Sequence, residues 1–356
     1  MRTVEWDNGA VKMIDQRALP HQLVIEDLNN YQEAAIAIKE MHVRGAPLIG
    51  ATAAYGMYLA CLEATEDYFN IFIKKAKTTL EATRPTAVNL FYGINAVFEA
   101  ISKGISKKEK TQLALKAARQ VTEESVLQCE AIGQHGLEII KEISAKKNGE
   151  RVNILTHCNA GWLACIDYGT ATAPMYAAHD AGIDIHIWVD ETRPRNQGAR
   201  ITAFEFQEHG IPHTVIVDNL GGHLMQHGLV DLVIVGSDRT TRTGDVANKI
   251  GTYLKALAAF DNQVPFYAAL PETTFDWSIS DGLKEIPIEE RGSDEVKYIQ
   301  GWNGNSIEKV LLTPKESPAL NYGFDVTPAK YITGLITEKG VCEANEASIK
   351  EMYFSE

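Results

Sequence analysis

The second half of the chain alternates short apolar runs with helix-length segments, and this alternation constrains the fold most. Strands separated by helix-length segments form a mostly parallel sheet that helices cover on both faces. We therefore predict an α/β fold with such a sheet for this half. The runs with strand character are Val152–Leu155, Asp184–Val189, His213–Val217, Leu232–Val235, Pro265–Ala269 and Lys309–Leu312.

The first half predicts a small β element followed by helices. Thr3–Trp6 and Ala10–Ile14 flank Asn8-Gly9, the strongest short hairpin signal, and His21–Ile25 offers a third strand. Helices are predicted for Tyr31–His42, from about Leu48, and for Tyr68–Leu80, Ala87–Ile101 and Ser106–Ser144. The helix from Leu48 carries Gly50, Ala54 and Gly56, small residues that let another element approach closely.

The chain has 356 residues, which exceeds the usual size of one core, so we expect two domains. The segment Ala145–Glu150 is polar and contains a glycine. We place the boundary there, between a domain of residues 1–148 and a domain of residues 149–356.

Composition excludes several classes of partner. The formal net charge of −13 argues against nucleic acid, so an anionic ligand would need a local basic pocket. The five cysteines form no CxxC pair, as expected for free thiols in a reducing cytoplasm. The N-terminus has no apolar signal region, and Ala46–Leu62 is too short and interrupted for a membrane span. Without GxGxxG, Walker A or HExxH motifs, a nucleotide cofactor has no support in the sequence.

Cys158 lies between a strand and a predicted helix. The strand is Val152–Leu155, a polar loop covers Thr156–Gly161, and the helical pattern starts at Trp162. Unpaired N–H groups at a helix start lower the pKa of a nearby thiol and favour a thiolate. The competing interpretation is a small buried residue that fills space. The polar neighbours in the Thr-His-Cys-Asn loop favour a functional cysteine.

Asp238 follows the apolar run Leu232–Val235, and ligands bind beyond the carboxyl ends of such strands. It is either a helix N-cap or a general acid whose pKa burial raises. The nearby segment Gly244–Tyr253 supplies an amide and an ammonium for a polar ligand. Arg44 and Arg84 stand at breaks before helices, where an anion is bound readily. Either arginine is otherwise an ordinary surface charge.

Histidine spacing gives only a weak metal signal. His223 and His227 lie four residues apart, as two ligands on one helical face would, but no third ligand is evident. His209 and His213 have the same spacing with a glycine and a proline between them, which break a helix. We predict ordinary surface or cap histidines and no metal.

Several blocks resemble the signatures of the methylthioribose-1-phosphate isomerases, in the family's order and over nearly the whole chain. Shorter matches lie at Glu5-Trp-Asp7, Phe324–Pro328 and Ile332–Gly340. The main blocks are Val43-Arg-Gly-Ala-Pro47, Leu155-Thr-His-Cys-Asn-Ala-Gly161, Asp190-Glu-Thr-Arg-Pro194, Gln197-Gly-Ala-Arg200, Gly236-Ser-Asp-Arg239 and Gly244-Asp-Val-Ala-Asn-Lys-Ile-Gly-Thr252.

The resemblance implies a helical N-terminal domain with a small β element, a Rossmann-like C-terminal domain, and a homodimer. It implies conversion of an aldose 1-phosphate to a ketose 1-phosphate in methionine salvage, with no cofactor and no metal. Cys158 and Asp238 would be the catalytic pair. The phosphate and hydroxyls of the sugar phosphate would be bound by Arg44, Gly45, Ala46, Arg84, Gln197, Asn248 and Lys249.

The chemistry accounts for these residue types. Because the anomeric oxygen carries the phosphate, an acid must protonate the ring oxygen as the ring opens, and Asp238 suits this step. Transfer of hydrogen from C2 to C1 needs a base, for which Cys158 is suited, or a dry pocket for a hydride shift. We expect Trp162 and Leu163 to supply the apolar surroundings of such a pocket.

Two departures from the family pattern keep alternatives open. Leu220-Gly221-Gly222-His223 stands where Met-Ala-Ala-His is expected, and Trp162 stands where a smaller residue is usual. We expect both to line the pocket, which leaves 5-deoxyribose 1-phosphate or another 5-modified pentose 1-phosphate as alternative substrates. Ribose 1,5-bisphosphate would need a second anion site, for which no extra basic cluster is seen. A non-catalytic assembly module, like the regulatory subunits of translation initiation factor two B, is the alternative of another class.

Overall fold

The computed structural model describes residues 2–84 and 87–355, so Pro85, which follows Arg84, lies outside the described residues. The chain opens with a three-stranded antiparallel sheet of β1 (Val4–Asp7), β2 (Ala10–Asp15) and β3 (Val24–Leu28). Asn8 and Gly9 form the predicted turn with φ of 48° and 93°. The third strand exists, but it begins three residues later in the chain than predicted.

A helical layer follows this sheet, as predicted, and its helices are α1 (Tyr31–Lys39), α2 (Ala46–Glu63), α3 (Phe69–Glu81) and α4 (Val88–Ser102). Nearly all of α2 is buried, up to Cys61. Glycines on both helices let α2 and α4 approach closely, because a Cβ on Gly50 would lie 2.7 Å from the carbonyl oxygen of Asn89 and one on Gly93 would lie 2.1 Å from that of Gly50. This contact fixes α2, whose first turn reaches the pocket described below.

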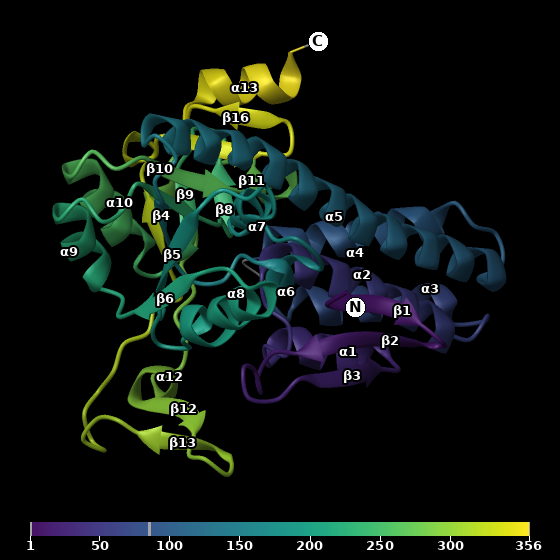
Figure 1. Cartoon of the computed structure of the whole chain (residues 1–356). Helices are drawn as coiled ribbons and strands as arrows, with labels where there is room; N and C mark the ends of the chain where they lie inside the picture. Colours follow the sequence, from purple (N-terminus) through teal and green to yellow (C-terminus); the bar gives the residue numbers. More distant parts are fainter. Residues whose placement is uncertain (1, 85–86, 356) are drawn as a thin grey trace.

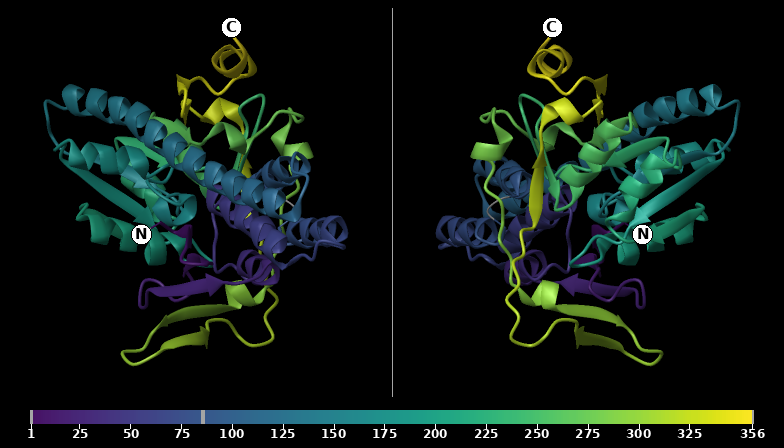
Figure 2. Two further views of the ribbon diagram at one scale, coloured as in Figure 1. Left: turned by 90° about the vertical axis from the view of Figure 1, so that its right-hand side faces the viewer. Right: turned by 90° about the vertical axis from the view of Figure 1, so that its left-hand side faces the viewer.

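The longest helix, α5 (Lys107–Lys146), runs along both halves of the molecule (Figures 1 and 2). Its first part packs in the N-terminal core, where Ala114, Ala118 and Val121 are buried. Its second part packs in the core around the large sheet through Ile132 and Ile140. We propose that the chain divides at residues 148 and 149, with α5 contributing side chains to both cores.

The second half contains a seven-stranded sheet in the order β16-β15-β10-β7-β4-β5-β6. All neighbouring pairs are parallel except β15 with β16, which confirms the predicted α/β class. The strands are β4 (Val152–Thr156), β5 (Ile185–Asp190), β6 (His213–Ile216), β7 (Leu232–Val235), β10 (Phe266–Ala269), β15 (Gly334–Thr337) and β16 (Gly340–Cys342).

Smaller elements surround this sheet. The helices are α6 (Trp162–Cys165), α7 (Ala173–Asp180), α8 (Ala203–His209), α9 (Leu220–Gln226), α10 (Thr252–Asp261), α11 (Gly282–Glu285), α12 (Asp294–Lys297) and α13 (Glu346–Phe354). A π-helical turn covers Gly198–Thr202, and 3₁₀ turns cover Glu272–Thr274 and Ala329–Tyr331. A four-stranded sheet in the order β11-β8-β9-β14 joins β8 (Arg239–Thr241), β9 (Val246–Lys249), β11 (Phe275–Asp276) and β14 (Phe324–Thr327).

The prediction that Lys309–Leu312 belongs to the parallel sheet was wrong. This run overlaps β13 (Ile307–Leu311), which pairs antiparallel with β12 (Tyr298–Trp302) in a hairpin that projects from the body (Figures 1 and 2). The strand beside β10 is instead β15. Val310 and Leu311 of β13 are exposed, so the run has strand character without being a buried strand.

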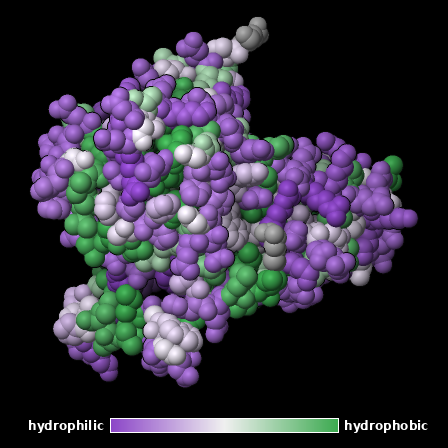
Figure 3. Space-filling model, in the orientation of Figure 1, coloured by the Kyte–Doolittle hydropathy of each residue, from purple (hydrophilic) through white to green (hydrophobic). Residues whose placement is uncertain are grey.

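The face of the molecule in Figure 3 is mainly hydrophilic, with an apolar patch over the projecting hairpin. Trp302, Val310 and Leu311 are the exposed large apolar side chains of that hairpin. Within residues 2–84 and 87–355, no helix combines the length and the apolar character needed to cross a membrane.

Candidate active site

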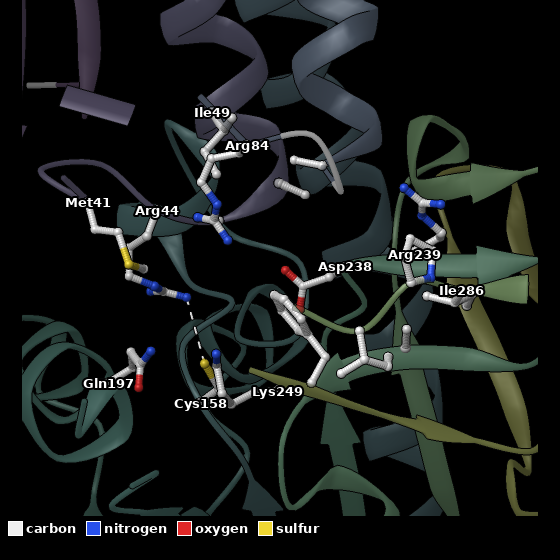
Figure 4. A pocket seen from close by; sticks show the side chains of 17 residues that line it. Met41, Arg44, Ile49, Arg84, Cys158, Gln197, Asp238, Arg239, Lys249 and Ile286 are labelled. Atoms are coloured by element: carbon white, nitrogen blue, oxygen red, sulfur yellow. Dashed lines mark hydrogen bonds between the residues drawn. The ribbon is translucent and has the colours of Figure 1, made fainter. Parts of the chain in front are cut away.

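A pocket lies between the N-terminal helices and the loops that follow β4 and β7 (Figure 4). It encloses about 50 Å³, and residues far apart in the sequence meet around it. They are Met41, Arg44, Gly45, Ala46, Ile49, Arg84, Ala87, Cys158, Gln197, Asp238, Arg239, Ala247, Lys249, Ile286, Pro287, Ile288 and Phe324.

All the catalytic and substrate-binding residues predicted from the sequence line this pocket except Asn248. Successive residues of a strand point to opposite faces, and Ala247 and Lys249 of β9 face the pocket. The side chain of Asn248 is buried on the other face, where its Nδ2 donates to Thr252 Oγ1 at 3.0 Å. Asn248 therefore shares the segment with the pocket residues, but its side chain is outside the pocket lining.

Cys158 is not at a helix start, contrary to the prediction. Helix α6 begins only at Trp162 and has four residues. Cys158 instead lies in the loop after β4 with a φ of 67°, and its N–H donates to Thr192 Oγ1 at 2.8 Å. The positive charges beside its sulfur are those of Arg44, whose Nη2 lies 3.7 Å from Sγ, and of Lys249 (Figure 4).

Arg44 joins the loop before α2 to the loop after β4. Its Nη1 donates to Asn159 Oδ1 at 2.7 Å and its Nη2 to the carbonyl oxygen of Asn159 at 2.6 Å. The next residue, Gly45, has a φ of 96°, and a Cβ there would lie 2.5 Å from Ala164. Only glycine fits this close approach, which brings Arg44 and Ala46 to the pocket edge.

Asp238 is not a helix N-cap, because β8 follows it and its N–H donates to the carbonyl oxygen of Ala247 at 2.9 Å. Burial raises the pKa of Asp238, while the charges of Lys249, Arg84 and Arg44 work in the opposite direction. Burial likewise lowers the pKa of Lys249, whose Nζ donates to the carbonyl oxygen of Gly323 at 2.9 Å. Burial in the pocket thus disfavours both the Asp238 carboxylate and the Lys249 ammonium.

Arg84 and Gln197 each bring a buried polar atom that has no hydrogen-bond partner among the described residues, namely Arg84 Nε and Gln197 Oε1. Leaving such atoms unpaired costs free energy, so a bound ligand or water is expected to pair with them. Arg84 Nη2 lies 3.4 Å from Glu289, and burial lowers the pKa of Arg84. A donor and an acceptor in one pocket suit a ligand with phosphate oxygens and hydroxyls.

The apolar wall of the pocket and one of its cations were not predicted from the sequence. The wall comes from Met41, Ile49, Phe324 and the segment Ile286–Ile288, none of which stands out in the sequence because apolar residues are common everywhere. Arg239 also lines the pocket, on the far side of Asp238 from Arg44, and it is paired with Asp276 (Figure 4). It directly follows Asp238, so its place in the Gly-Ser-Asp-Arg block was the available signal.

The expectation that Trp162 and the glycines of α9 line the pocket was wrong, and Leu163 does not line it either. Trp162 packs with the cluster of Ile14, Leu19, Leu163 and Ile201. A Cβ on Gly221 would lie 2.8 Å from the side chain of Leu155, so glycine at this position allows α9 to pack closely against β4.

The groups of side chains that resemble metal ligands already hold cations of the protein. His157 Nδ1 and Lys255 Nζ lie 2.8 and 3.0 Å from the same oxygen of the buried Asp190, and Asp218 is nearby. In the other group, of Asp15, Glu26 and His42, Arg17 binds both carboxylates. His223 and His227 are exposed on the surface, as predicted, with His227 Nδ1 near the carbonyl oxygen of His223.

The sequence of this chain is similar to those of known proteins over nearly its whole length. Residues 42–344 match the initiation factor 2 subunit family. The methylthioribose-1-phosphate isomerase of Rhodospirillum rubrum is 58% identical over 353 residues, which covers 98% of this chain and 90% of that protein. The chain belongs to the methylthioribose-1-phosphate isomerase family.

Solved structures of this family and its relatives have the same fold. The 5-methylthioribose 1-phosphate isomerase from Pyrococcus horikoshii OT3 has a TM-score of 0.86 at 38% identity and covers 99% of this chain and 95% of its own. The structure titled translation initiation factor eIF-2B, subunit delta, from A. fulgidus has a TM-score of 0.82 at 40% identity and covers 99% of both chains.

In this isomerase fold, a buried carboxyl group lies behind the Arg44–Asn159 contact. Glu205 of α8 accepts from the Leu163 N–H at 2.8 Å and from the Tyr176 hydroxyl at 3.0 Å. Burial raises the pKa of Glu205 to about 7, although these hydrogen bonds and Asn159 oppose the shift. In the unfolded chain the pKa of Glu205 is near 4.5. Between about pH 4.5 and pH 7, Glu205 is therefore protonated in the folded protein and ionised in the unfolded chain.

We predict that Glu205 makes the folded state less stable as pH rises from about 4.5 to about 7, by a few kcal/mol in total. Glu205→Gln removes this dependence, because glutamine does not titrate. Urea unfolding at several pH values in this window measures the difference between variant and wild type. Glu208→Gln, exposed on the same helix, is the control. A stability difference that stays constant over the window contradicts the prediction.

Proposed function

We propose that this pocket is the active site in which the chain converts 5-methylthioribose 1-phosphate into 5-methylthioribulose 1-phosphate. Membership of the family makes the chain an aldose–ketose isomerase. The observation that carries the assignment is the convergence of Arg44, Cys158, Asp238 and Lys249, which belong to separate sequence blocks, on one pocket. The reaction belongs to methionine salvage.

We assign the phosphate to the cationic side of the pocket. Among residues 2–84 and 87–355, Arg44 donates to neutral oxygens of Asn159 and lies near the Cys158 sulfur, and no carboxylate of these residues pairs with it directly. Charge-assisted hydrogen bonds from such a guanidinium to phosphate are strong. Arg84, with its unpaired Nε, and the N–H groups at the start of α2 after Gly45 add donors on the same side. Gln197 Oε1 suits a sugar hydroxyl.

Asp238 is the proposed acid of ring opening. Its raised pKa keeps more of the carboxyl protonated than in water, so that it can give a proton to the ring oxygen as the C–O bond breaks. The same carboxylate can then take a proton back from a hydroxyl of the open sugar. Lys249, beside it, favours the ionised form after the proton has left.

Hydrogen then moves from C2 to C1 by one of two routes. Cys158 as the base removes the C2 proton and returns it to C1, with Arg44 Nη2 at 3.7 Å from its sulfur. Alternatively, hydride passes directly between the carbons in the part of the pocket walled by Ile49, Ile286 and Phe324, whose apolar side chains disfavour water. Reaction in D₂O separates the routes, because exchange of a base-bound proton places deuterium at C1 and a hydride shift does not.

A homodimer in the cytoplasm is the proposed setting. All five cysteines are free, as a reducing compartment requires. The dimer rests on the family resemblance, and measurement of molar mass in solution tests it.

Cys158→Ser and Asp238→Asn are each expected to lower kcat by a factor of roughly a hundred or more, because each removes a proton-transfer group. Substrate binding should be largely kept, since neither change removes a phosphate contact. Initial-rate kinetics provide the measurement, and Cys342→Ser, at a half-buried cysteine outside the pocket, is the control. Near-normal turnover in either variant would remove that residue from the catalytic pair.

Arg44→Ala is expected to raise KM by about ten- to a hundredfold, because a charge-assisted contact to a dianion contributes roughly 1.5–3 kcal/mol. Competitive inhibition by inorganic phosphate should weaken in parallel. Arg242→Ala, which removes an arginine paired with Glu346 outside the pocket, is the matched control. Unchanged KM and phosphate inhibition in Arg44→Ala would place the phosphate elsewhere.

A substrate panel tests the function itself. Burial of the methylthio group against the apolar wall should favour 5-methylthioribose 1-phosphate over 5-deoxyribose 1-phosphate in kcat/KM by roughly tenfold, because the added sulfur and methyl group each contribute about 0.8 kcal/mol, the value for one buried methylene. Ribose 1,5-bisphosphate should be poorer, because Arg239 is already paired with Asp276. A tenfold preference for either other sugar overturns the substrate assignment. No turnover of any sugar phosphate favours a non-catalytic assembly module.

A further inference from the structure

Cys158 has an unusual backbone conformation for its residue type. Its φ of 67° lies in the left-handed region, which L-residues other than glycine, asparagine and aspartate seldom adopt. Such a conformation persists only where the surroundings hold it in place. The contacts that hold it come from two threonine hydroxyls.

The two hydroxyls bind opposite sides of the residue. The N–H of Cys158 donates to Thr192 Oγ1 at 2.8 Å, and Thr202 Oγ1 donates to the carbonyl oxygen of Cys158 at 2.7 Å. Both threonines are fully buried. The left-handed residue is thus clamped at its donor and at its acceptor.

Each hydroxyl is also fixed by a second bond. Thr192 Oγ1 donates its proton to the carbonyl oxygen of Asp190 at 3.0 Å, and Thr202 Oγ1 accepts from Asn159 Nδ2 at 3.2 Å. Since a hydroxyl has a single proton, these bonds leave each oxygen with one defined direction of donation. Asn159 also accepts a hydrogen bond from Arg44, so it links Thr202 to Arg44.

Both threonines belong to the segment that follows β5. This segment returns toward the end of β5 in a tight path, since a Cβ on Gly198 would lie 1.7 Å from the carbonyl oxygen of Asp190. It ends in the π-helical turn Gly198–Thr202, and π-helical turns occur frequently at functional sites. The same segment places Gln197 in the pocket, whereas neither threonine lines it.

We propose that Thr192 and Thr202 are positioning residues that hold Cys158 in its left-handed conformation, so that its sulfur faces the pocket beside Arg44. The proposal rests on the catalytic role proposed for Cys158. It predicts that loss of either hydroxyl affects the chemical step more than substrate binding, because the phosphate contacts stay in place.

The test compares Thr192→Val and Thr202→Val with Thr192→Ser and Thr202→Ser. Valine keeps the shape and removes the hydroxyl, and serine keeps the hydroxyl. Thr122→Val is the control, because Thr122 is a buried threonine of α5 outside the pocket lining, and its hydroxyl pairs with the carbonyl oxygen of Ala118 and with Tyr55 but with no part of the Cys158 loop. The measurements are kcat, KM, inhibition by inorganic phosphate, thermal unfolding, and the rate at which iodoacetamide alkylates Cys158, followed by peptide mass.

We expect each valine variant to lower kcat by about ten- to a hundredfold, as a small misplacement of a reacting group does, while KM and phosphate inhibition stay near the wild type. The alkylation rate of Cys158 should change, and serine should restore both quantities. If Thr202→Val yields no folded protein, Thr192→Val and its serine partner decide the matter.

Valine variants with unchanged kcat and unchanged alkylation overturn the proposal, as do serine variants that lose as much as valine variants. A changed alkylation rate with unchanged kcat supports the positioning and overturns the catalytic role of Cys158. Cys158→Ser provides the independent check on that role, so the two failures can be told apart.

Discussion

The guanidinium group of Arg44 connects the two halves of the molecule at the pocket. It leaves the loop before α2 and binds Asn159 in the loop after β4. A buried charge needs hydrogen-bond partners, and here they are a neutral side-chain oxygen and a neutral carbonyl. Neutral partners hold the side chain without cancelling its charge. The positive charge of Arg44 can therefore interact with the Cys158 sulfur and with a bound phosphate.

Asp238 and Lys249 show how the pocket sets its chemistry. Burial alone would favour a neutral acid and a neutral amine, and it shifts the pKa of each group in that direction. Their mutual attraction works against both shifts, as do the two arginines in the case of Asp238. An acid and a base that lie close together, with pKa values both shifted toward the neutral form, are typical of sites of proton transfer.

The residues behind the pocket explain why its loops keep their shape. His157, next to Cys158, lies 2.8 Å from Asp190 and 2.9 Å from the carbonyl oxygen of Ile250, which follows Lys249. Lys255 pairs with the same carboxylate. The loop that carries Cys158 is thereby tied to Ile250 at the end of β9, and the side chains of His157, Asp190 and Lys255 do not line the pocket.

The sequence by itself determined the types of most elements and the ends of the strands where the site forms, because turn residues and apolar periodicity act locally. The family signature blocks in the sequence also predicted that Cys158, Asp238, Arg44 and Lys249 belong to one active site. The tertiary structure decided that Cys158 has a left-handed backbone conformation and does not lie at a helix start. It also decided that the side chain of Lys249, and not that of Asn248, faces the pocket, and that Trp162 packs away from the pocket. It also supplied the apolar wall from Ile286–Ile288 and left Lys309–Leu312 outside the parallel sheet. These outcomes depend on which distant segments come together, and a pattern confined to neighbouring residues does not contain that information.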